Sequence, residues 1–517
     1  MRATLYTNYI IMAITENSIR NTYYRLKNKA NSYLNNGNIH KALLYVHLAS
    51  YTDHTFFLSY HDNELEEILK RVADRIKPSK NNNITPNKNR CVMLDSLSRY
   101  RGGLAVQYIN AIASAGWELL YVTCQEIDAP QRKELKTFLN SIQGVTILEV
   151  PKHLEGLAKL QYIYDSILSY SPSKLYCHLN AYDAYFSTIA YALPKFISKF
   201  IINITDHASQ LGFQSCNYSF EFRELGCSIS NIHRGIESDH LLYLPFYPLI
   251  DNIPFKGLPS ICKGKKIILS GGRYFKVMDK DDTFFKLVKK IIDKHPDVVV
   301  VFPGSEDDYM IKMKIKEYRL ENYLILLGWR CDISELFRHA DIFLNTYPHG
   351  GATMAQYAAH LHVPILSFRP EGYCANPVEC FVCQDGYTEI SSIGESEFLE
   401  EASRLLNDKD YARQKAEDTY SCVLGVEKFN TYFKEMSETC RNIIPFRLDP
   451  YVDIDISQRA KLIAYHNKVG EYQMRLVALS GINSITLSKT YLYPFVKKIL
   501  PKFINLALKR GLHLNRF

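Results

Sequence analysis

The strongest constraint on this chain is an alternation of apolar strands and helices that runs along the sequence twice. The first run begins at Cys91 with "CVMLDSL" and continues to "KFIINIT" at 199–205. The second begins with "KKIILSGGRY" at 265–274, and its next strand, "DVVVVFPG", is a continuous β-branched stretch, typical of a strand buried on both faces. Strands that alternate with helices predict a doubly wound parallel sheet, so we expect two such α/β domains.

At 517 residues the chain is too long for one hydrophobic core. We predict a helical N-terminal region at 1–88, a first Rossmann-like domain at 89–255, a second at 256–445 and a helical basic tail at 446–517. The segment "KPSKNNNITPNKNR" lacks apolar periodicity and ends the first region. Within that region, "KANSYLNNGNIHKALLYVHLAS" places an Asn-Gly turn between two amphipathic halves. A single helical pair of this kind must pack on a neighbour.

The net charge of +8 belongs to the end of the chain. No acidic residue follows Glu471, whereas eight basic residues do: Arg475, Lys489, Lys497, Lys498, Lys502, Lys509, Arg510 and Arg516. A nucleic-acid-binding protein spreads its charge over a binding face, so we expect no nucleic acid as partner. From Pro494, apolar residues recur at helical spacing opposite lysines. Residues 485–517 therefore either lie on an anionic membrane surface or pack on the protein.

The cysteines indicate a reducing compartment, because all twelve are scattered without framework spacing. Cys374, Cys380 and Cys383 include a Cys-x-x-Cys pair, but a fourth zinc ligand is missing, and we interpret them as free thiols. No apolar run reaches the roughly eighteen residues of a membrane span, and "YIIMAI" lacks the flanks of a signal peptide. We expect a cytoplasmic protein, peripheral on the inner face of the membrane if the tail binds lipid.

The segment "NTYPHGGATMAQ" places a glycine turn between a strand and a helix. Gly350 and Gly351 permit close approach of a ligand to the backbone, and the helix N-terminus that follows favours an anion. Thr353 adds a hydroxyl in the first turn, and Gln356, one turn further, is placed to contact a ribose. These features predict a phosphate site; the alternative is a plain strand–turn–helix connection.

A second loop, "SGGRYFKVMDKD", follows the first strand of the second domain. In a parallel sheet this loop lies at the same edge as the glycine turn. Arg273 and Lys276 would therefore provide cations for a diphosphate bound at the predicted phosphate site. The alternative is an ordinary surface lysine. Asp279 and Asp281 match a metal-binding Asp-x-Asp pattern, but their place at a helix start favours capping, and we predict no metal site.

The first domain offers candidate residues for binding a second substrate and for general base catalysis. Gly102 and Gly103 form its first strand-to-helix turn, where a substrate can approach the backbone. Asp206 and His207 follow the strand at 199–205, and we predict His207 as a general base, with Asp206 orienting it or acting as the base itself. His178, at another strand end, is a weaker candidate. The alternative for each histidine is a structural role.

Several of these segments resemble one family. "LGWRCDISELFRHADIFLNTYPHGGATMAQYAAHLHVP" resembles the donor-binding half of GT-B glycosyltransferases. "YFKVMDKD" resembles the lysine segment of O-GlcNAc transferase and the bacterial adhesin N-glucosyltransferases, and "LGFQSCNYSFEF" is similar to a further segment of that family. The resemblance covers roughly 90–440, and the tetratricopeptide-like helical pair also fits.

The resemblance implies a GT-B fold, with two Rossmann-like domains facing a cleft. It also implies an inverting, metal-independent transfer from a UDP-sugar to a glycan, lipid-linked or protein acceptor, with no cofactor beyond the nucleotide-sugar. The diphosphate-binding lysine becomes Lys276, and the other implied donor-site residues are Trp329, His349, Gly350, Gly351, Ala352 and Thr353.

Two positions depart from the family pattern. Tyr357, next to Gln356, occupies the place of the family's ribose-binding acid, and His362 replaces the glycine of Gly-Val-Pro. Two alternative functions stay open. One is a non-catalytic GT-B module that binds a glycan or a partner glycosyltransferase. The other is a UDP-sugar 2-epimerase, which needs several acidic cleft residues, and few are seen here.

Overall fold

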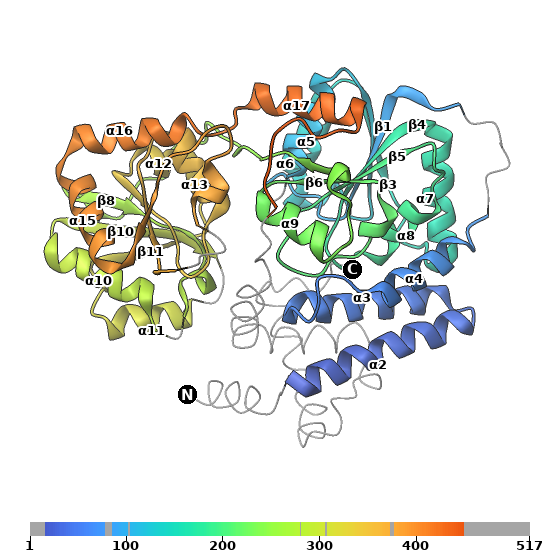
Figure 1. The fold of residues 1–517 in the computed structure, drawn as a ribbon, viewed down its shortest axis with the longest axis horizontal. Helices are drawn as coiled ribbons and strands as arrows, with labels where there is room; N and C mark the ends of the chain where they lie inside the picture. The colour runs from blue at the N-terminus through green and yellow to red at the C-terminus, as the bar shows by residue number, and fades with distance from the viewer. Residues whose placement is uncertain are drawn as a thin grey trace. The chain divides into compact units, whose positions relative to one another are not determined.

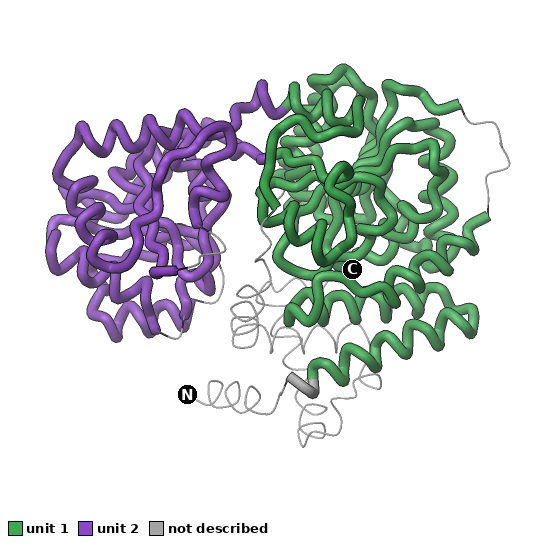
Figure 2. The backbone as a smooth tube through the Cα atoms, in the orientation of Figure 1, with its two compact units in different colours: residues 1–244, 430–517 green, residues 245–429 purple. Residues whose placement is uncertain are grey.

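The computed structural model describes residues 16–77, 85–101, 104–279, 281–305, 308–372 and 377–448. The chain forms two compact units, one of residues 1–244 with 430–517 and one of residues 245–429 (Figure 2). Among the residues that carry predictions, Gly102, Gly103, Cys374 and the tail at 485–517 lie outside the described residues. No helix in the described part is both long and apolar enough to span a membrane.

The first unit contains a seven-stranded, all-parallel sheet in the order β3-β2-β1-β4-β5-β6-β7. Its strands are β1 (Asn87–Asp95), β2 (Glu118–Thr123), β3 (Val145–Glu149), β4 (Pro172–His178), β5 (Ser198–Ile202), β6 (Tyr218–Glu221) and β7 (Leu241–Tyr243). The connecting helices are α5 (Ala105–Ser114), α6 (Lys133–Ser141), α7 (Gly156–Tyr170), α8 (Ala184–Ala192) and α9 (Glu224–Ile232). The predicted alternation of strands and helices is confirmed here.

Three N-terminal helices belong to the same core as this sheet. They are α2 (Glu16–Asn35), α3 (Ile39–Phe56) and α4 (Asn63–Ala73). The predicted Asn-Gly turn joins α2 to α3, with Gly37 at φ +75° and the Asn38 side chain capping α3. Because α3 contacts α7 and α8 while α4 contacts α8 (Figure 1), the helical pair buries its apolar face against the sheet domain.

The chain returns to the first unit through α17 (Val426–Thr439). The Phe433 ring lies 5.6 Å from Tyr108 on α5, 5.2 Å from Tyr176 on β4 and 5.7 Å from Phe220 on β6, measured between ring centroids. Because of this aromatic packing, the chain from residue 430 onward belongs to the first compact unit. The predicted domain limits at 255/256 and 445/446 differ from the limits of the second compact unit, which comprises residues 245–429.

The second unit contains a parallel sheet in the order β11-β10-β8-β12-β13-β14, with the short β9 paired to the end of β10. Its strands are β8 (Lys266–Leu269), β9 (Gly272–Arg273), β10 (Val298–Ser305), β11 (Leu324–Gly328), β12 (Ile342–Leu344), β13 (Ile365–Arg369) and β14 (Ser391–Ile393). Both units therefore repeat one topology. In the first unit, successive strands are added on one side of β1 as far as β3 and on its other side from β4 onward. In the second unit the same switch in strand order falls between β8 and β12.

Helices cover both faces of the second sheet (Figure 1). They are α10 (Thr283–Lys294), α11 (Tyr309–Glu317), α12 (Ile333–Arg338), α13 (Ala352–His360), α14 (Glu379–Val382), α15 (Gly394–Asn407) and α16 (Lys409–Tyr420). Asp279 Oδ1 accepts a hydrogen bond from Thr283 N at 2.8 Å, which confirms the predicted capping role of Asp279 at α10. His362 has φ +53°, so the histidine adopts the left-handed conformation that a glycine tolerates more easily.

Candidate donor site at the edge of the second sheet

Two predicted loops meet at the carboxyl ends of β8 and β12, which are neighbouring strands. Lys276 lies in the short helical turn Tyr274–Val277, and its Nζ donates to Gly350 O at 3.0 Å. The backbone N–H of His349 in turn donates to Lys276 O at 3.3 Å. The structure therefore brings the lysine loop and the glycine turn together at the topological switch point, where ligands of such sheets bind.

The glycine turn is held in shape from below by buried polar side chains. Asn345 Oδ1 accepts from Gly351 N at 2.9 Å, and Thr346 Oγ1 donates to His349 O at 2.5 Å. A β-carbon at Gly350 would lie 3.3 Å from the Phe381 ring, so the turn has little room for a side chain. Asn345 was not predicted, although a polar residue directly after an apolar strand is a signal for such a position.

Helix α13 begins with an N-cap residue that cannot cap it. Gly351 has no side chain to accept a hydrogen bond from the first turn, and Thr353 in that turn is exposed. The first N–H groups of a helix have no partner within the helix and attract anions. Lys276, His349 and Ala352 are half-buried around this helix start, which gives an anion both backbone donors and a cation.

Trp329 stands at the end of β11 on a rigid loop. Asp332 Oδ1 accepts from Arg330 Nε at 2.7 Å, and Asp332 Oδ2 accepts from Lys256 N at 2.8 Å. The hydrogen bonds from Arg330 lower the pKa of Asp332 to about 2, so its carboxylate stays charged. The Trp329 side chain is 66% exposed beside this ion pair, and Arg273 is also exposed at the same edge of the sheet.

Gln356 and Tyr357 have structural contacts. Gln356 is fully buried, and its Nε2 donates to Phe381 O. Tyr357 donates its hydroxyl to Leu249 O at 2.5 Å and stacks on Phe337, with 5.8 Å between ring centroids. These contacts tie α13 to its surroundings. The ribose contact of Gln356 stays a prediction, and the place of the family's acid is occupied by a tyrosine that anchors the backbone.

In the first unit, Asp206 and His207 follow β5 as predicted, but they differ in exposure. Asp206 is buried and forms an ion pair with Arg223, whose Nη2 donates to Asp206 Oδ1 at 2.7 Å. Burial alone would raise the pKa of Asp206, but the charge of Arg223 and its hydrogen bonds lower it well below the usual range. His207 has its Nδ1 3.3 Å from Asp206 Oδ1, and its side chain is 47% exposed.

His178, the weaker candidate for the general base, is not available as a base in the structure. It is 1% exposed, and its Nδ1 lies 2.9 Å from Asp95 Oδ1. Leu104 N donates to its Nε2 at 3.3 Å, so the ring proton is on Nδ1, facing Asp95. Both ring nitrogens are thus used inside the protein, and the role of His178 is structural.

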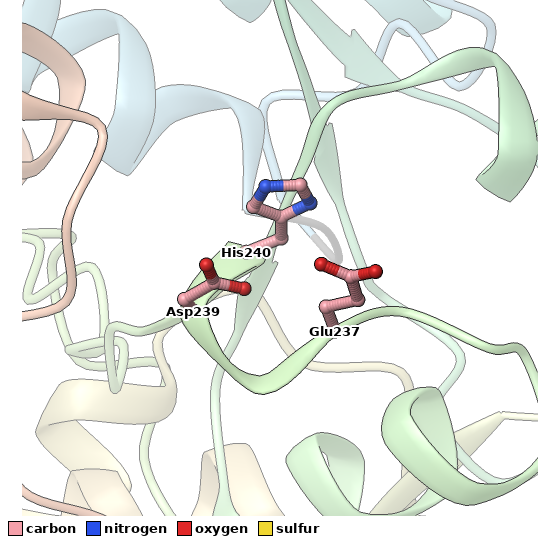
Figure 3. Close-up of side chains that lie close together, drawn as sticks. All are labelled: Glu237, Asp239 and His240. Carbon is pink, nitrogen blue, oxygen red and sulfur yellow. The ribbon is translucent and has the colours of Figure 1, made fainter.

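Glu237, Asp239 and His240 form the one group in the described residues whose ligand atoms lie close enough to hold a metal ion, within 4.8 Å of one another. The two carboxylates flank the His240 ring (Figure 3). This group directly precedes β7 and so lies at the amino edge of the first sheet, opposite the edge that carries Asp206 and His207.

No protein-family model and no curated protein matches this chain. Solved structures do. A mutant O-GlcNAc transferase of Thermobaculum terrenum is 13% identical, with the match covering 80% of this chain and 85% of the transferase, and superposes with a TM-score of 0.50. A glycosyltransferase from Rickettsia africae ESF-5 is also 13% identical, with the match covering 68% of this chain and 98% of that protein, and a TM-score of 0.50.

At this identity the likeness concerns the fold. It agrees with the two parallel sheets of the same strand order and with the segments in which the sequence resembles glycosyltransferases. The chain has the α/β fold of the GT-B glycosyltransferases.

Proposed function

We propose that the protein is a glycosyltransferase that transfers a sugar from a nucleotide-sugar, specifically a UDP-sugar, to an acceptor hydroxyl or amide. The observation that carries the proposal is the meeting of Lys276 and the glycine turn, with Nζ 3.0 Å from Gly350 O at the start of α13. In this arrangement a diphosphate placed against the helix start would also meet the lysine.

The donor half of the reaction needs stabilisation of a leaving group. When the bond between the anomeric carbon and the phosphate oxygen breaks, its electron pair stays on the nucleoside diphosphate. The first-turn N–H groups of α13 and the Lys276 ammonium would stabilise that added charge. We propose that these groups serve without a metal ion, with Arg273, Trp329 and Thr353 lining the same edge of the sheet.

For the acceptor half, we propose His207 as the base that removes the acceptor proton as the new bond forms, with inversion at the anomeric carbon. Its exposed ring can reach a substrate, while the buried Asp206 carboxylate beside Nδ1 would orient the ring. Asp206 itself is a poor base because Arg223 keeps its pKa low. The acceptor is proposed to be a glycan or a lipid-linked glycan at the inner face of the membrane, or a protein.

Calorimetric titration with UDP, with and without magnesium, tests the proposal. The wild-type protein should bind UDP without magnesium, and Lys276→Ala should weaken binding by about tenfold to 100-fold, the value of a hydrogen bond to a charged group. Lys316→Ala, which removes an exposed lysine on α11, is the matched control and should bind like wild type. Failure of the wild type to bind UDP under either condition refutes the proposed function, and strict dependence on magnesium refutes the metal-free mechanism.

A further inference from the structure

Arg369 is the last residue of β13, and within the described part of the chain it is a cation without a counter-charge. Its side chain is half-buried, and its Nε is shielded from solvent with no hydrogen-bond partner among those residues. No carboxylate there forms an ion pair with its guanidinium, and the Tyr387 phenol, on which its charge acts, is neutral at physiological pH. Because buried polar groups normally have partners, an arginine that lacks both a partner for Nε and a counter-charge in this part of the chain is available to a ligand.

The direction of the Arg369 side chain follows from strand alternation. Leu366 belongs to the core that β13 shares with α10 and α15, and the Phe368 ring lies 5.9 Å from Phe398 of α15. Ser367 and Arg369 therefore face the opposite side of the sheet. On that side Ser367 Oγ accepts from Asn345 Nδ2 at 3.3 Å.

That face is also the face of the glycine turn. The other end of the Asn345 amide, Oδ1, accepts from Gly351 N at the start of α13, and α13 contacts β13. Arg369 lies two residues beyond Ser367, about 6.6 Å further toward the carboxyl edge of the strand. It is therefore placed on the α13 side of the sheet, at the edge where the first turn of α13 begins.

Positive features thus come from three successive strands, β8, β12 and β13, at one edge of the sheet. Lys276 follows β8, the N-terminus of α13 follows β12, and Arg369 ends β13. We propose that Arg369 is a further cation of the donor site and binds an oxyanion of the nucleotide-sugar. This inference rests on the function proposed above. The oxyanion comes either from the diphosphate or from the carboxylate of an acidic sugar, since a guanidinium pairs with both in bidentate geometry.

The experiment compares UDP, UDP-glucose and UDP-glucuronate in calorimetric titrations of wild type, Arg369→Gln, Arg369→Lys and the exposed-charge control Lys316→Gln. We expect Arg369→Gln to lose about tenfold to 100-fold in affinity, and the control to lose none. Arg369→Lys should fall between, because it keeps the charge and loses the bidentate fork. Unchanged unfolding midpoints establish that the variants are folded.

The pattern across ligands identifies the oxyanion. An equal loss for all three ligands assigns Arg369 to the diphosphate, whereas a loss confined to UDP-glucuronate assigns it to the sugar carboxylate. Unchanged affinity of Arg369→Gln for every ligand that the wild type binds overturns the inference and leaves the proposed function intact. If the wild type binds none of the three, the proposed function and this inference fail together.

Discussion

The carboxyl edges of the two sheets share one topology but differ in what occupies them. In the first unit, the buried Asp95 at the end of β1 receives hydrogen bonds from Leu97 N, Ser98 N, Tyr121 Oη and His178 Nδ1. In the second unit, Lys276 follows β8 and the glycine turn follows β12, with Arg369 at the end of the next strand. Protein donors thus surround the carboxylate at the end of β1, whereas we propose that the edge of the second sheet presents donors and cations to an anion.

The N-terminal helices complete the closure of the first edge. His47 Nδ1 on α3 lies 2.8 Å from Tyr182 O, and His54 Nδ1 lies 3.1 Å from Ser209 O. Glu66 on α4 accepts from Gly212 N at 2.8 Å. The loops after β4 and β5 are thus fixed by helices that precede the sheet in sequence. His207 lies in the second of these loops and keeps an exposed ring. In the function proposed above, the second sheet binds the donor and the first sheet positions the base His207.

The largest effect is expected from His207→Ala, which tests the proposed role of the first unit's edge. If the exposed ring is the base, kcat should fall by about 100-fold to 10,000-fold, the usual contribution of general base catalysis, while UDP affinity stays unchanged. The measurement is a sugar-transfer or donor-hydrolysis assay together with UDP titration. His240→Ala is the matched control, because it removes a histidine from the amino edge of the same sheet.

Equal activity of His207→Ala and wild type would remove the catalytic role from the first unit's edge. A parallel loss of UDP affinity would instead make His207 part of the donor site, and the division of labour between the two sheets would fail.

The next largest effect is expected from His178→Ala. The substitution leaves a cavity and removes one donor from the buried Asp95 carboxylate, so the first unit should lose about 3 kcal/mol of stability. Chemical denaturation measures this loss, and Tyr121→Phe, which removes a single donor to the same carboxylate, should cost less. A His178→Ala protein of normal stability but without transferase activity would show that this edge is not a closed, structural one.

Sequence reasoning succeeded where the signal was local. The long apolar strands and the loops after β8 and β12 were predicted, because neighbouring parallel strands bring their carboxyl ends together. It failed where the signal was distant or short. The structural role of His178 depends on Asp95 and Leu104, far away in sequence. Strands such as β7 and β14 span three residues each, too few for any periodicity. Arg369 was missed since one arginine at a strand end has no local pattern.

The smallest expected effect concerns the helices that close the first edge, and it depends on pH. Burial raises the pKa of Glu66 to about 7, whereas the unfolded chain has the ordinary value near 4.5. Between these values the folded state keeps a proton that the unfolded state has lost, so stability falls as pH rises through this window. The loss is complete above pH 7, and the part of it that falls above pH 6 amounts to roughly 1.4 kcal/mol.

Glu66→Gln should remove this slope. The amide oxygen can still accept from Gly212 N, and the amide N–H can donate to Tyr191, whose hydroxyl bonds to Glu66 in the wild type. Between pH 6 and pH 8.5, the unfolding midpoint of the wild type should therefore fall, and that of Glu66→Gln should stay level. The control Glu67→Gln, which alters an exposed neighbour on α4, should behave like the wild type. The window starts at pH 6 because Asp53, also buried, has its pKa raised to about 6 and adds its own slope below that point. If the unfolding midpoint of Glu66→Gln still falls with pH, Glu66 is not the group that makes the stability of the first unit depend on pH.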